Sequence, residues 1–253
     1  MHLFDLKNKT VLITGAASGL GEHFAYLCLS AGAKVIVTAR KLKQLDSFKA
    51  SKNKDIFLLE MDVSLKSSVT DGLEQLEKHH KKIDILIHCA GIAKYTPIFE
   101  QDQNNDFEQI IQTNLMGTWY VIKAIAEHMK TYHISGSIIH IGSVNGDATP
   151  AFGGAGYNVS RSATMHLTKS LVGELSPHNI RINTISTWMI PTPMTREFLD
   201  KNENQVNTMT PLGLAQLDDL DGAILYLASN KASRYVTGSC ITVDGGISWG
   251  GAK

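Results

Sequence analysis

The chain has 253 residues, 43% of them hydrophobic, and its 24 lysines and arginines balance 24 aspartates and glutamates. This length suits one large domain or two small ones with a sizeable core, and zero formal net charge gives no electrostatic reason to expect a nucleic acid or an anionic membrane as a partner. The first residues lack the apolar region of a signal peptide, and no apolar run approaches the ~20 residues of a membrane span, so we expect a cytoplasmic protein.

Apolar runs of strand length alternate with amphipathic stretches of helix length along the chain. We expect strands at 10–15, 34–39, 55–63, 83–91, 137–143, 181–186 and 239–246, and helices at 19–31, 41–50, 66–80, 105–130, 155–175 and 217–229, with an irregular segment after the sixth strand. The strand runs do not alternate between apolar and polar residues, which is typical of strands covered on both faces. The pattern predicts an α/β fold, a single doubly wound Rossmann domain over residues 1–253, with a parallel sheet of about seven strands and helices on both faces.

A glycine-rich turn, TGAASGLG at residues 14–21, joins the first strand to the first helix. Glycine permits positive φ and close approach of the backbone to a ligand, and a helix N-terminus presents free N–H groups to a phosphate. Three glycines would also suit an ordinary turn, but their place between a first strand and a helix favours a dinucleotide site. The predicted contacts are Gly15, Ser18, Gly19, Leu20 and Gly21.

The end of the second strand bears on which dinucleotide binds. An acidic residue there would bind both ribose hydroxyls and favour NAD, but the sequence has Ala39-Arg40. Arg40 can pair with a 2′-phosphate through charge-assisted hydrogen bonds, and Lys41 and Lys43 could assist. The alternative is the basic start of a solvated helix. The sequence therefore favours NADP(H), with NAD(H) still compatible.

Together with this turn, the later motifs resemble those of the short-chain dehydrogenase/reductase family over nearly the whole chain. They are Asp62-Val63 after the third strand, His88-Cys89-Ala90-Gly91 after the fourth, Asn114, Ser143, Tyr157, the pair Ile190 and Thr192, and the tail motifs Tyr235-Val236-Thr237-Gly238 and Val243-Asp244-Gly245-Gly246. The resemblance implies that Asp62 and Val63 contact the adenine and that Thr192 grips the carboxamide. It also implies that Ala90, Gly91 and Ile190 line the cofactor site.

Tyr157 and Arg161 are four positions apart on a predicted helix, so their side chains share one face. A tyrosine with a pKa near ~10 is a poor base at neutral pH, and a fixed cation about 4 Å away favours phenolate by roughly 4 kcal/mol. The resemblance implies that Tyr157 is the general acid and base and that Arg161 activates it, both also contacting the cofactor. It further implies that Ser143 binds the substrate oxygen and that Asn114 is a relay residue.

Two departures from the family pattern leave two interpretations open. Arg161 stands where the family has lysine, and its planar guanidinium differs in shape from a compact ammonium. Thr187-Trp188 stands where the family usually has Pro-Gly, which puts a large ring beside the nicotinamide unless the loop takes another path. The chain is either an active oxidoreductase with a retuned site, or an impaired relative that binds NADP(H) as a sensor or a non-catalytic subunit.

The remaining expectations concern the substrate, the assembly and the isolated polar residues. We expect a small-molecule carbonyl or alcohol as substrate, covered by a lid at about 189–212, and the resemblance implies a homotetramer or homodimer. His88 is interpreted as a buried group with satisfied hydrogen bonds rather than as a ligand. Cys28, Cys89 and Cys240 are expected to be buried free thiols, and no metal site is expected.

Overall fold

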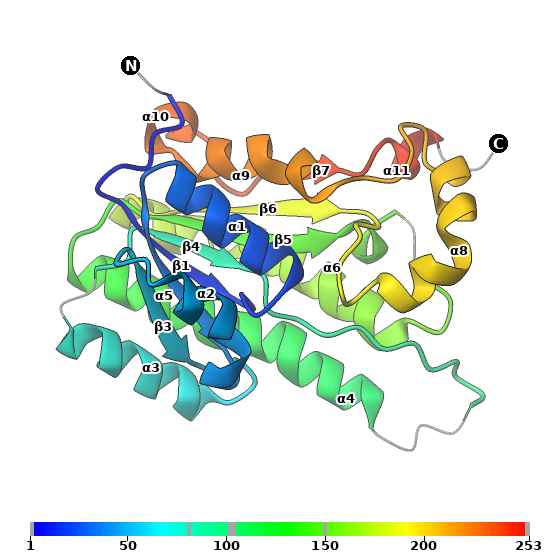
Figure 1. The fold of residues 1–253 in the computed structure, drawn as a ribbon, viewed down its shortest axis with the longest axis horizontal. Helices are drawn as coiled ribbons and strands as arrows, with labels where there is room; N and C mark the ends of the chain where they lie inside the picture. The colour runs from blue at the N-terminus through cyan, green and yellow to red at the C-terminus, as the bar shows by residue number, and fades with distance from the viewer. Residues whose placement is uncertain (1–2, 80–81, 101–104, 149–150, 251–253) are drawn as a thin grey trace.

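The computed structural model describes residues 3–79, 82–100, 105–148 and 151–250. Within them, seven parallel strands form one sheet in the order β3-β2-β1-β4-β5-β6-β7, so the predicted doubly wound parallel sheet is confirmed (Figure 1). The strands are β1 (Thr10–Thr14), β2 (Lys34–Ala39), β3 (Ile56–Glu60), β4 (Ile85–His88), β5 (Ser137–Ser143), β6 (Arg181–Thr187) and β7 (Cys240–Val243). The order reverses between β1 and β4, and such a switch point opens a crevice at the carboxyl ends of the strands.

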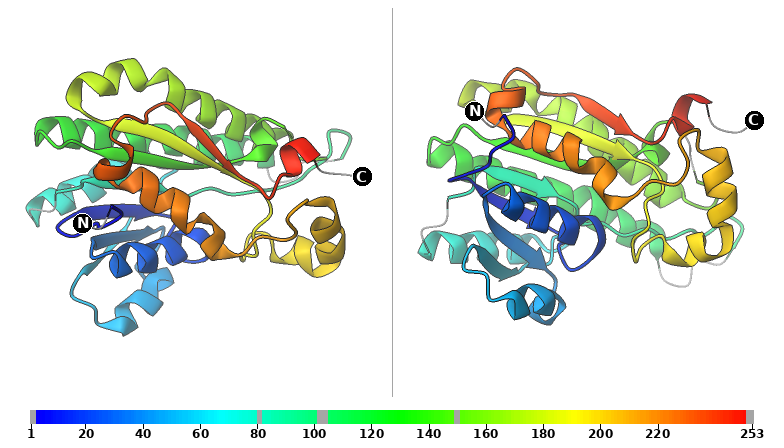
Figure 2. Two further views of the ribbon diagram at one scale, coloured as in Figure 1. Left: turned by 90° about the horizontal axis from the view of Figure 1, so that it is seen from above. Right: turned by 45° about the horizontal axis from the view of Figure 1, so that its top comes forward.

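Helices cover both faces of the sheet (Figure 2). One face carries α1 (Gly19–Ser30), α2 (Asp46–Ser51) and α9 (Asp221–Ala228), and the other carries α3 (Lys66–Lys78), α5 (Gly117–Thr131) and α6 (Ala155–Ser170). The shorter or more peripheral helices are α4 (Asp106–Ile110), α7 (Val172–Leu175), α8 (Arg196–Met209), α10 (Asn230–Ser233) and α11 (Ile247–Gly250). None of the helices in the described residues is long and apolar enough to cross a membrane.

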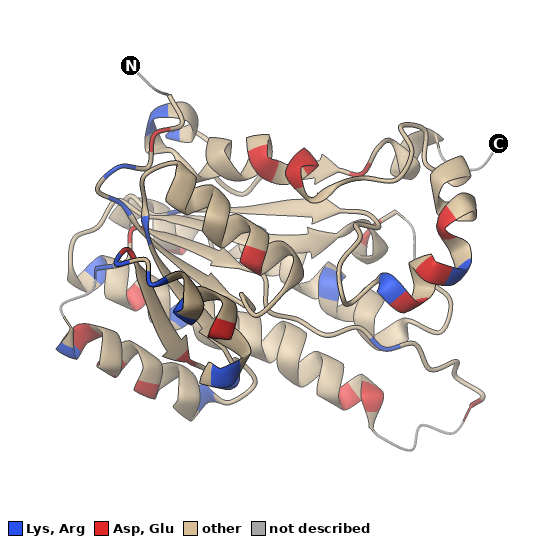
Figure 3. Cartoon of the chain, viewed as in Figure 1, with Lys and Arg blue, Asp and Glu red and all other residues tan. Residues whose placement is uncertain are grey.

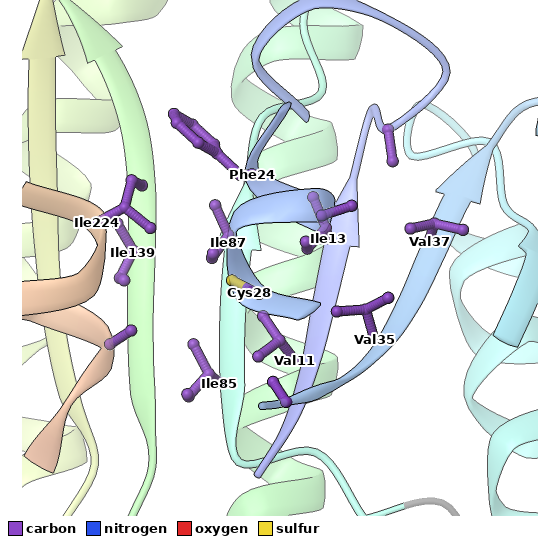
Figure 4. Close-up of a cluster of buried hydrophobic side chains, with 14 of the residues drawn as sticks. Val11, Ile13, Phe24, Cys28, Val35, Val37, Ile85, Ile87, Ile139 and Ile224 are labelled. Atoms are coloured by element: carbon purple, nitrogen blue, oxygen red, sulfur yellow. The ribbon is translucent and has the colours of Figure 1, made fainter. Parts of the chain in front are cut away.

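Each central strand contributes side chains to two separate cores. In β1, Val11 and Ile13 pack under α1 with Phe24 and Cys28 (Figure 4), while Leu12 points to the opposite core. Successive residues of a strand alternate between its faces, so a strand covered on both faces needs apolar residues throughout. This explains why the apolar runs in the sequence lack alternation. Charged residues of both signs lie mainly on the surrounding helices and loops (Figure 3).

The segment after the sixth strand differs from the prediction. It was expected to be irregular, but it contains the 14-residue helix α8. Only Leu199 and Val206 of this helix are buried, and most of its other side chains are exposed and polar. Only four of its 14 residues are apolar, and the two buried ones are seven positions apart, which is too weak a periodicity to mark a helix.

Other predicted bounds need smaller corrections. The expected helix at 105–130 is interrupted by a π-helical turn, Ile111–Met116, and the expected helix at 155–175 divides into α6 and α7. The predicted helix at 66–80 ends at Lys78, and residue 80 lies outside the described residues. All three cysteines are free as expected, but only Cys28 is fully buried, where burial raises its pKa to about 12.

Candidate active site

A cavity of about 790 Å³ lies at the carboxyl ends of β1 to β4, beside the point where the strand order reverses. A cavity of this size and place suits a large cofactor. Seven predicted cofactor contacts line it together: Gly15, Ser18, Arg40, Asp62, Val63, Ala90 and Gly91. The other predicted contacts, Gly19, Leu20, Gly21, Tyr157, Arg161, Ile190 and Thr192, are not among its lining residues.

The glycine turn fits against the loop that follows β4. Gly15 has φ of +67°, and a Cβ built there would lie 2.8 Å from both the N and Cα of Ala90. Both the backbone conformation and the lack of space therefore require glycine. Ser18 is the N-cap of α1, and within the described residues its side chain makes no capping hydrogen bond. The first N–H groups of α1 are thus available to a phosphate.

Arg40 lines the rim of the cavity with Ala17 and Ser18. It is exposed, and its guanidinium has no hydrogen bond or ion pair within the described part of the chain. The neighbouring Lys41 is engaged, because its Nζ lies 3.1 Å from Oε1 of Glu60. This hydrogen bond, followed by one from the backbone of Leu42, lowers the pKa of the Glu60 carboxyl. Arg40 remains able to pair with an anion, whereas Lys41 is already paired.

Asp62 shapes the cavity wall that follows β3. Its Oδ1 accepts hydrogen bonds from the backbone N–H and the hydroxyl of Ser64, at 3.0 and 2.7 Å. Gln112 donates from Nε2 to the carbonyl of Ser64 at 2.7 Å and lines the cavity together with Thr113 and Asn105. The sequence analysis missed these three residues because polar positions at the start of a helix are also typical of a solvated face.

Asn114 lies in the π-helical turn and joins two other segments of the site. Its Oδ1 accepts from the backbone N–H of Ile92 at 2.8 Å, and its Nδ2 donates to the carbonyl of Ile92 at 2.9 Å and to Oγ of Ser160 at 3.0 Å. It therefore fixes the loop after β4 to α6. Single π-helical turns within longer helices are frequent at functional sites.

Ser143 and Tyr157 come from adjacent elements. Ser143 ends β5, and its hydroxyl donates to Oδ1 of Asn145 at 2.9 Å and accepts from the Asn145 backbone at 3.2 Å. The short turn after Ser143 packs on α6, because a Cβ at Gly146 would meet the Ser162 nitrogen at 2.6 Å. Tyr157 is 8% exposed on α6. The half-exposed Tyr95, which the sequence analysis missed, places its ring centroid 6.1 Å from that of Tyr157.

Arg161 is buried one turn after Tyr157, as the spacing predicts, with only 5% of its surface exposed. Its Cζ lies 4.9 Å from the centroid of the Tyr157 ring, over the ring face, and Nη1 donates to the carbonyl of Ile141 at 3.2 Å. A Cβ at Gly91 would lie 2.7 Å from Nη2 of Arg161 and 3.2 Å from Oδ1 of Asn114. The bare α-carbon of Gly91 thus makes room for the guanidinium beside Asn114.

Two histidine rings lie behind this cluster. His88 and His140 are fully buried and stacked, with their centroids 5.8 Å apart. Burial lowers the pKa of His88 to about 3, and the Arg161 charge acts in the same direction. His88 bonds through Nδ1 to Thr14 at 2.8 Å and through Nε2 to Thr118 at 3.0 Å. The interpretation of His88 as a buried group with satisfied hydrogen bonds is confirmed.

Trp188 is not among the residues that line this cavity. Its Nε1 donates to Oγ1 of Thr210 at 3.2 Å, at the end of α8. The loop instead brings Thr192 over the glycine turn, since a Cβ at Gly19 would lie 3.2 Å from Cβ of Thr192. Ile190 is 3% exposed and accepts a hydrogen bond from Thr195 through its carbonyl.

Comparisons with known proteins identify chains of similar sequence. Residues 15–248 match the sequence profile of the family described as enoyl-(acyl carrier protein) reductase. The chain is 33% identical to a gluconate 5-dehydrogenase of Gluconobacter oxydans, over 97% of this chain and 96% of that protein.

Two solved structures have the same fold. A short-chain type dehydrogenase/reductase from Mycobacterium marinum superposes with a TM-score of 0.90 at 34% identity, covering 98% of each chain. A gluconate 5-dehydrogenase from Burkholderia cenocepacia, solved in complex with NADP and tartrate, superposes with a TM-score of 0.88 at 29% identity, covering 97% of each chain.

Proposed function

The chain belongs to the short-chain dehydrogenase/reductase family and is an NAD(P)-dependent oxidoreductase, and from this premise we propose that it prefers NADP(H) and interconverts a carbonyl and a secondary alcohol. The single observation that supports catalysis most strongly is the buried cluster of Tyr157, Arg161 and Asn114 around Gly91, at the edge of the cavity. A cation held against a buried tyrosine is the arrangement that proton transfer at neutral pH requires.

The residues of the cavity fit a bound NADP(H). The turn at Gly15 brings the backbone close to where a pyrophosphate would lie, and the uncapped N-terminus of α1 suits its negative charge. Arg40 would hold the 2′-phosphate, because its guanidinium lines the cavity with Ser18 and has no ion pair among the residues that the structure describes. Asp62 and Val63 would line the adenine end, and Thr192 would cover the other end. When bound, the cofactor supplies or accepts the hydride.

Tyr157 would move the proton that accompanies the hydride. In the reducing direction its hydroxyl donates the proton to the carbonyl oxygen, and in the oxidising direction its phenolate accepts the proton of the alcohol. The Arg161 charge favours the phenolate form. Ser143, at the end of β5, would donate a hydrogen bond to the substrate oxygen and so stabilise its developing negative charge. To do this, its hydroxyl must turn from Asn145, its partner in this structure.

Asn114, the expected relay residue, would contribute by holding the surrounding backbone in place. Both ends of its amide are engaged, by Ile92 on one side and by Ile92 and Ser160 on the other. Its side chain therefore has little freedom to move, and its contribution is to fix the loop after β4 against α6. That loop carries the part of the cavity wall nearest to Arg161.

One observation favours a second candidate, a protein that binds NADP(H) without turnover. The Arg161 guanidinium lies over the Tyr157 ring face and bonds to Ile141, and no hydrogen bond joins it to the tyrosine hydroxyl within the described residues. An arginine in this position would preserve the fold and the cofactor site, but it would activate the tyrosine hydroxyl only weakly.

A substrate screen separates the two candidates. Purified protein is mixed with NADPH and a panel of ketones, keto sugar acids and 3-oxoacyl thioesters, and NADPH consumption is followed by absorbance. The enzyme proposal predicts turnover that Tyr157→Phe abolishes while NADPH affinity stays within about twofold, because the phenyl ring of the variant can still pack under Arg161. Binding of NADPH with no consumption on the whole panel would support the second candidate.

We also propose the assembly and the organisation that the resemblance implies. Residues 1–253 would form one domain in which residues 189–212, including α8, act as the substrate lid. Met194 and Phe198 of this segment are half-exposed, which suits a lid that contacts a small molecule. The protein would be cytoplasmic and would form a homotetramer or homodimer.

A further inference from the structure

His88 occupies the centre of the sheet, at the carboxyl end of β4. It pairs in register with Thr14 of β1 on one side and with His140 of β5 on the other. These are the strands around the reversal of the strand order, where the cavity opens. A polar ring with no exposed surface at this place must satisfy both of its nitrogens, because an unpaired buried polar atom costs stability.

The hydrogen bonds around His88 have a single consistent direction. The hydroxyl of Thr118 donates to the backbone carbonyl of Asn114, so its only proton is used and it must accept from Nε2–H of His88. Nδ1 of His88 is then unprotonated and accepts from the hydroxyl of Thr14. The Thr14 hydroxyl in turn accepts from the backbone N–H of Ala90 at 3.3 Å.

Five groups therefore form one chain of hydrogen bonds, running Ala90, Thr14, His88, Thr118 and Asn114. Its first member lines the cofactor cavity, and its last lies in the π-helical turn that holds Ile92 and Ser160. We propose that His88 is a positioning residue that couples the cofactor-binding loop after β4 to Asn114. This proposal rests on the proposed function, since it assigns His88 a role in the same site.

The surroundings of His88 favour its neutral form, which this series of hydrogen bonds requires. The charged and titratable groups that face it are Arg161 of α6 and the stacked His140 of β5, with Cys89 next to it in sequence. Burial lowers the pKa of both histidines, and the Arg161 charge opposes a second positive charge nearby. A proton on Nδ1 would face the donor hydroxyl of Thr14 and break the chain there.

The tautomer of His88 is the most direct test, and it needs neither substrate nor turnover. Histidine-selective ¹⁵N NMR of the intact protein would report which ring nitrogen carries the proton, with the signal assigned by its loss in His88→Asn. We expect the Nε2–H form, unchanged across the pH range in which the protein is folded. An Nδ1–H tautomer, or a titrating ring, would overturn the proposal.

Breaking this chain of hydrogen bonds at Thr118 tests whether it contributes to catalysis. Thr118→Val removes the hydroxyl but keeps the side-chain volume, and we expect kcat to fall about tenfold with the substrate KM nearly unchanged. Thr118→Ser restores the hydroxyl and should return kcat to within about threefold of the parent. Enzyme concentration is taken from titrated NADPH sites, so that loss of folded protein does not imitate a loss of kcat.

Thr168→Val is the matched control. Thr168 is 1% exposed on α6, donates back to the Met165 carbonyl at 2.8 Å and bonds to Thr184, so its loss has a similar effect on stability. We expect its kcat to stay within about twofold of the parent. Equal kcat for the Thr118→Val and Thr168→Val variants would overturn the proposal. If the parent shows no turnover, the proposed function fails, and the NMR tautomer alone then decides the role of His88.

Discussion

Removing the positive charge of Arg161 should shift the pH dependence of the reaction. The Cζ of Arg161 lies 4.9 Å from the centroid of the Tyr157 ring, and both residues are buried. A positive charge close to this ring stabilises the negative charge that develops on the tyrosine oxygen during proton transfer. Arg161→Ala should therefore move the rising limb for alcohol oxidation to higher pH and lower kcat at pH 7 by about tenfold or more.

The direction follows from the charge. Loss of a nearby cation disfavours the anionic form of Tyr157, so the base needed for oxidation appears only at higher pH. In the reducing direction the neutral acid is needed, and its range extends to higher pH instead. Both profiles should therefore shift to higher pH, so that at a fixed alkaline pH oxidation slows while reduction is maintained or rises. This contrast between the two rates separates the effect from a general loss of activity.

Two further variants make this test specific. Arg161→Lys keeps the charge and should preserve or raise kcat, although it loses the hydrogen bond to Ile141. Lys169→Ala removes an exposed cation two turns further along α6 and should leave the profile unchanged. The assay is a pH–rate profile of each variant on one accepted substrate, with thermal melting to verify folding. If the profile of Arg161→Ala superposes on that of the parent, Arg161 does not activate Tyr157.

Three other variants or measurements test the cofactor site and the assembly. Arg40→Ala should weaken NADPH binding by about 1–3 kcal/mol and leave NADH binding nearly unchanged, as measured by fluorescence titration, because a charge-assisted contact to the 2′-phosphate is lost; equal losses would exclude that role. Gly15→Ala should abolish binding of both cofactors and lower the melting temperature, since its Cβ would lie 2.8 Å from the Ala90 backbone and its φ is +67°; Gly173→Ala, with nothing within 4 Å of the added Cβ, is the control. Light scattering at micromolar protein should give the mass of a tetramer or dimer, and a monomer mass would contradict the assembly.

The fold could be predicted because its signals are local. Apolar runs without alternation identify strands covered on both faces, and the bounds at 34–39 and 137–143 match the structure. The glycine turn and Asp62 mark two ends of one cavity because parallel strands bring their carboxyl ends to one edge. Arg161 could likewise be placed beside Tyr157 from their four-residue spacing.

The structural features that the sequence could not predict depend on contacts between distant segments. The direction of the Trp188 ring is set by Thr210, a partner 22 residues away. The position of Gln112 in the cavity wall depends on the carbonyl of Ser64. A π-helical turn has the composition of an ordinary helix, so nothing at 111–116 distinguishes it in the sequence. Each of these features is decided by packing rather than by local propensity.

The position of the Arg161 side chain helps to decide whether the site is active with an altered residue or has lost its function. A guanidinium is broader than an ammonium and needs acceptors and space in its own plane. Here Nη1 finds the Ile141 carbonyl, Nη2 lies over the bare α-carbon of Gly91, and the aromatic face of Tyr157 lies against Cζ. An arginine left in a decaying site would be expected to turn toward solvent, where its charge is hydrated at no cost. This side chain instead stays buried, although its Nε has no hydrogen-bond partner within the described residues. The surrounding backbone is thus arranged around a guanidinium, which supports the proposal of an active site built on arginine.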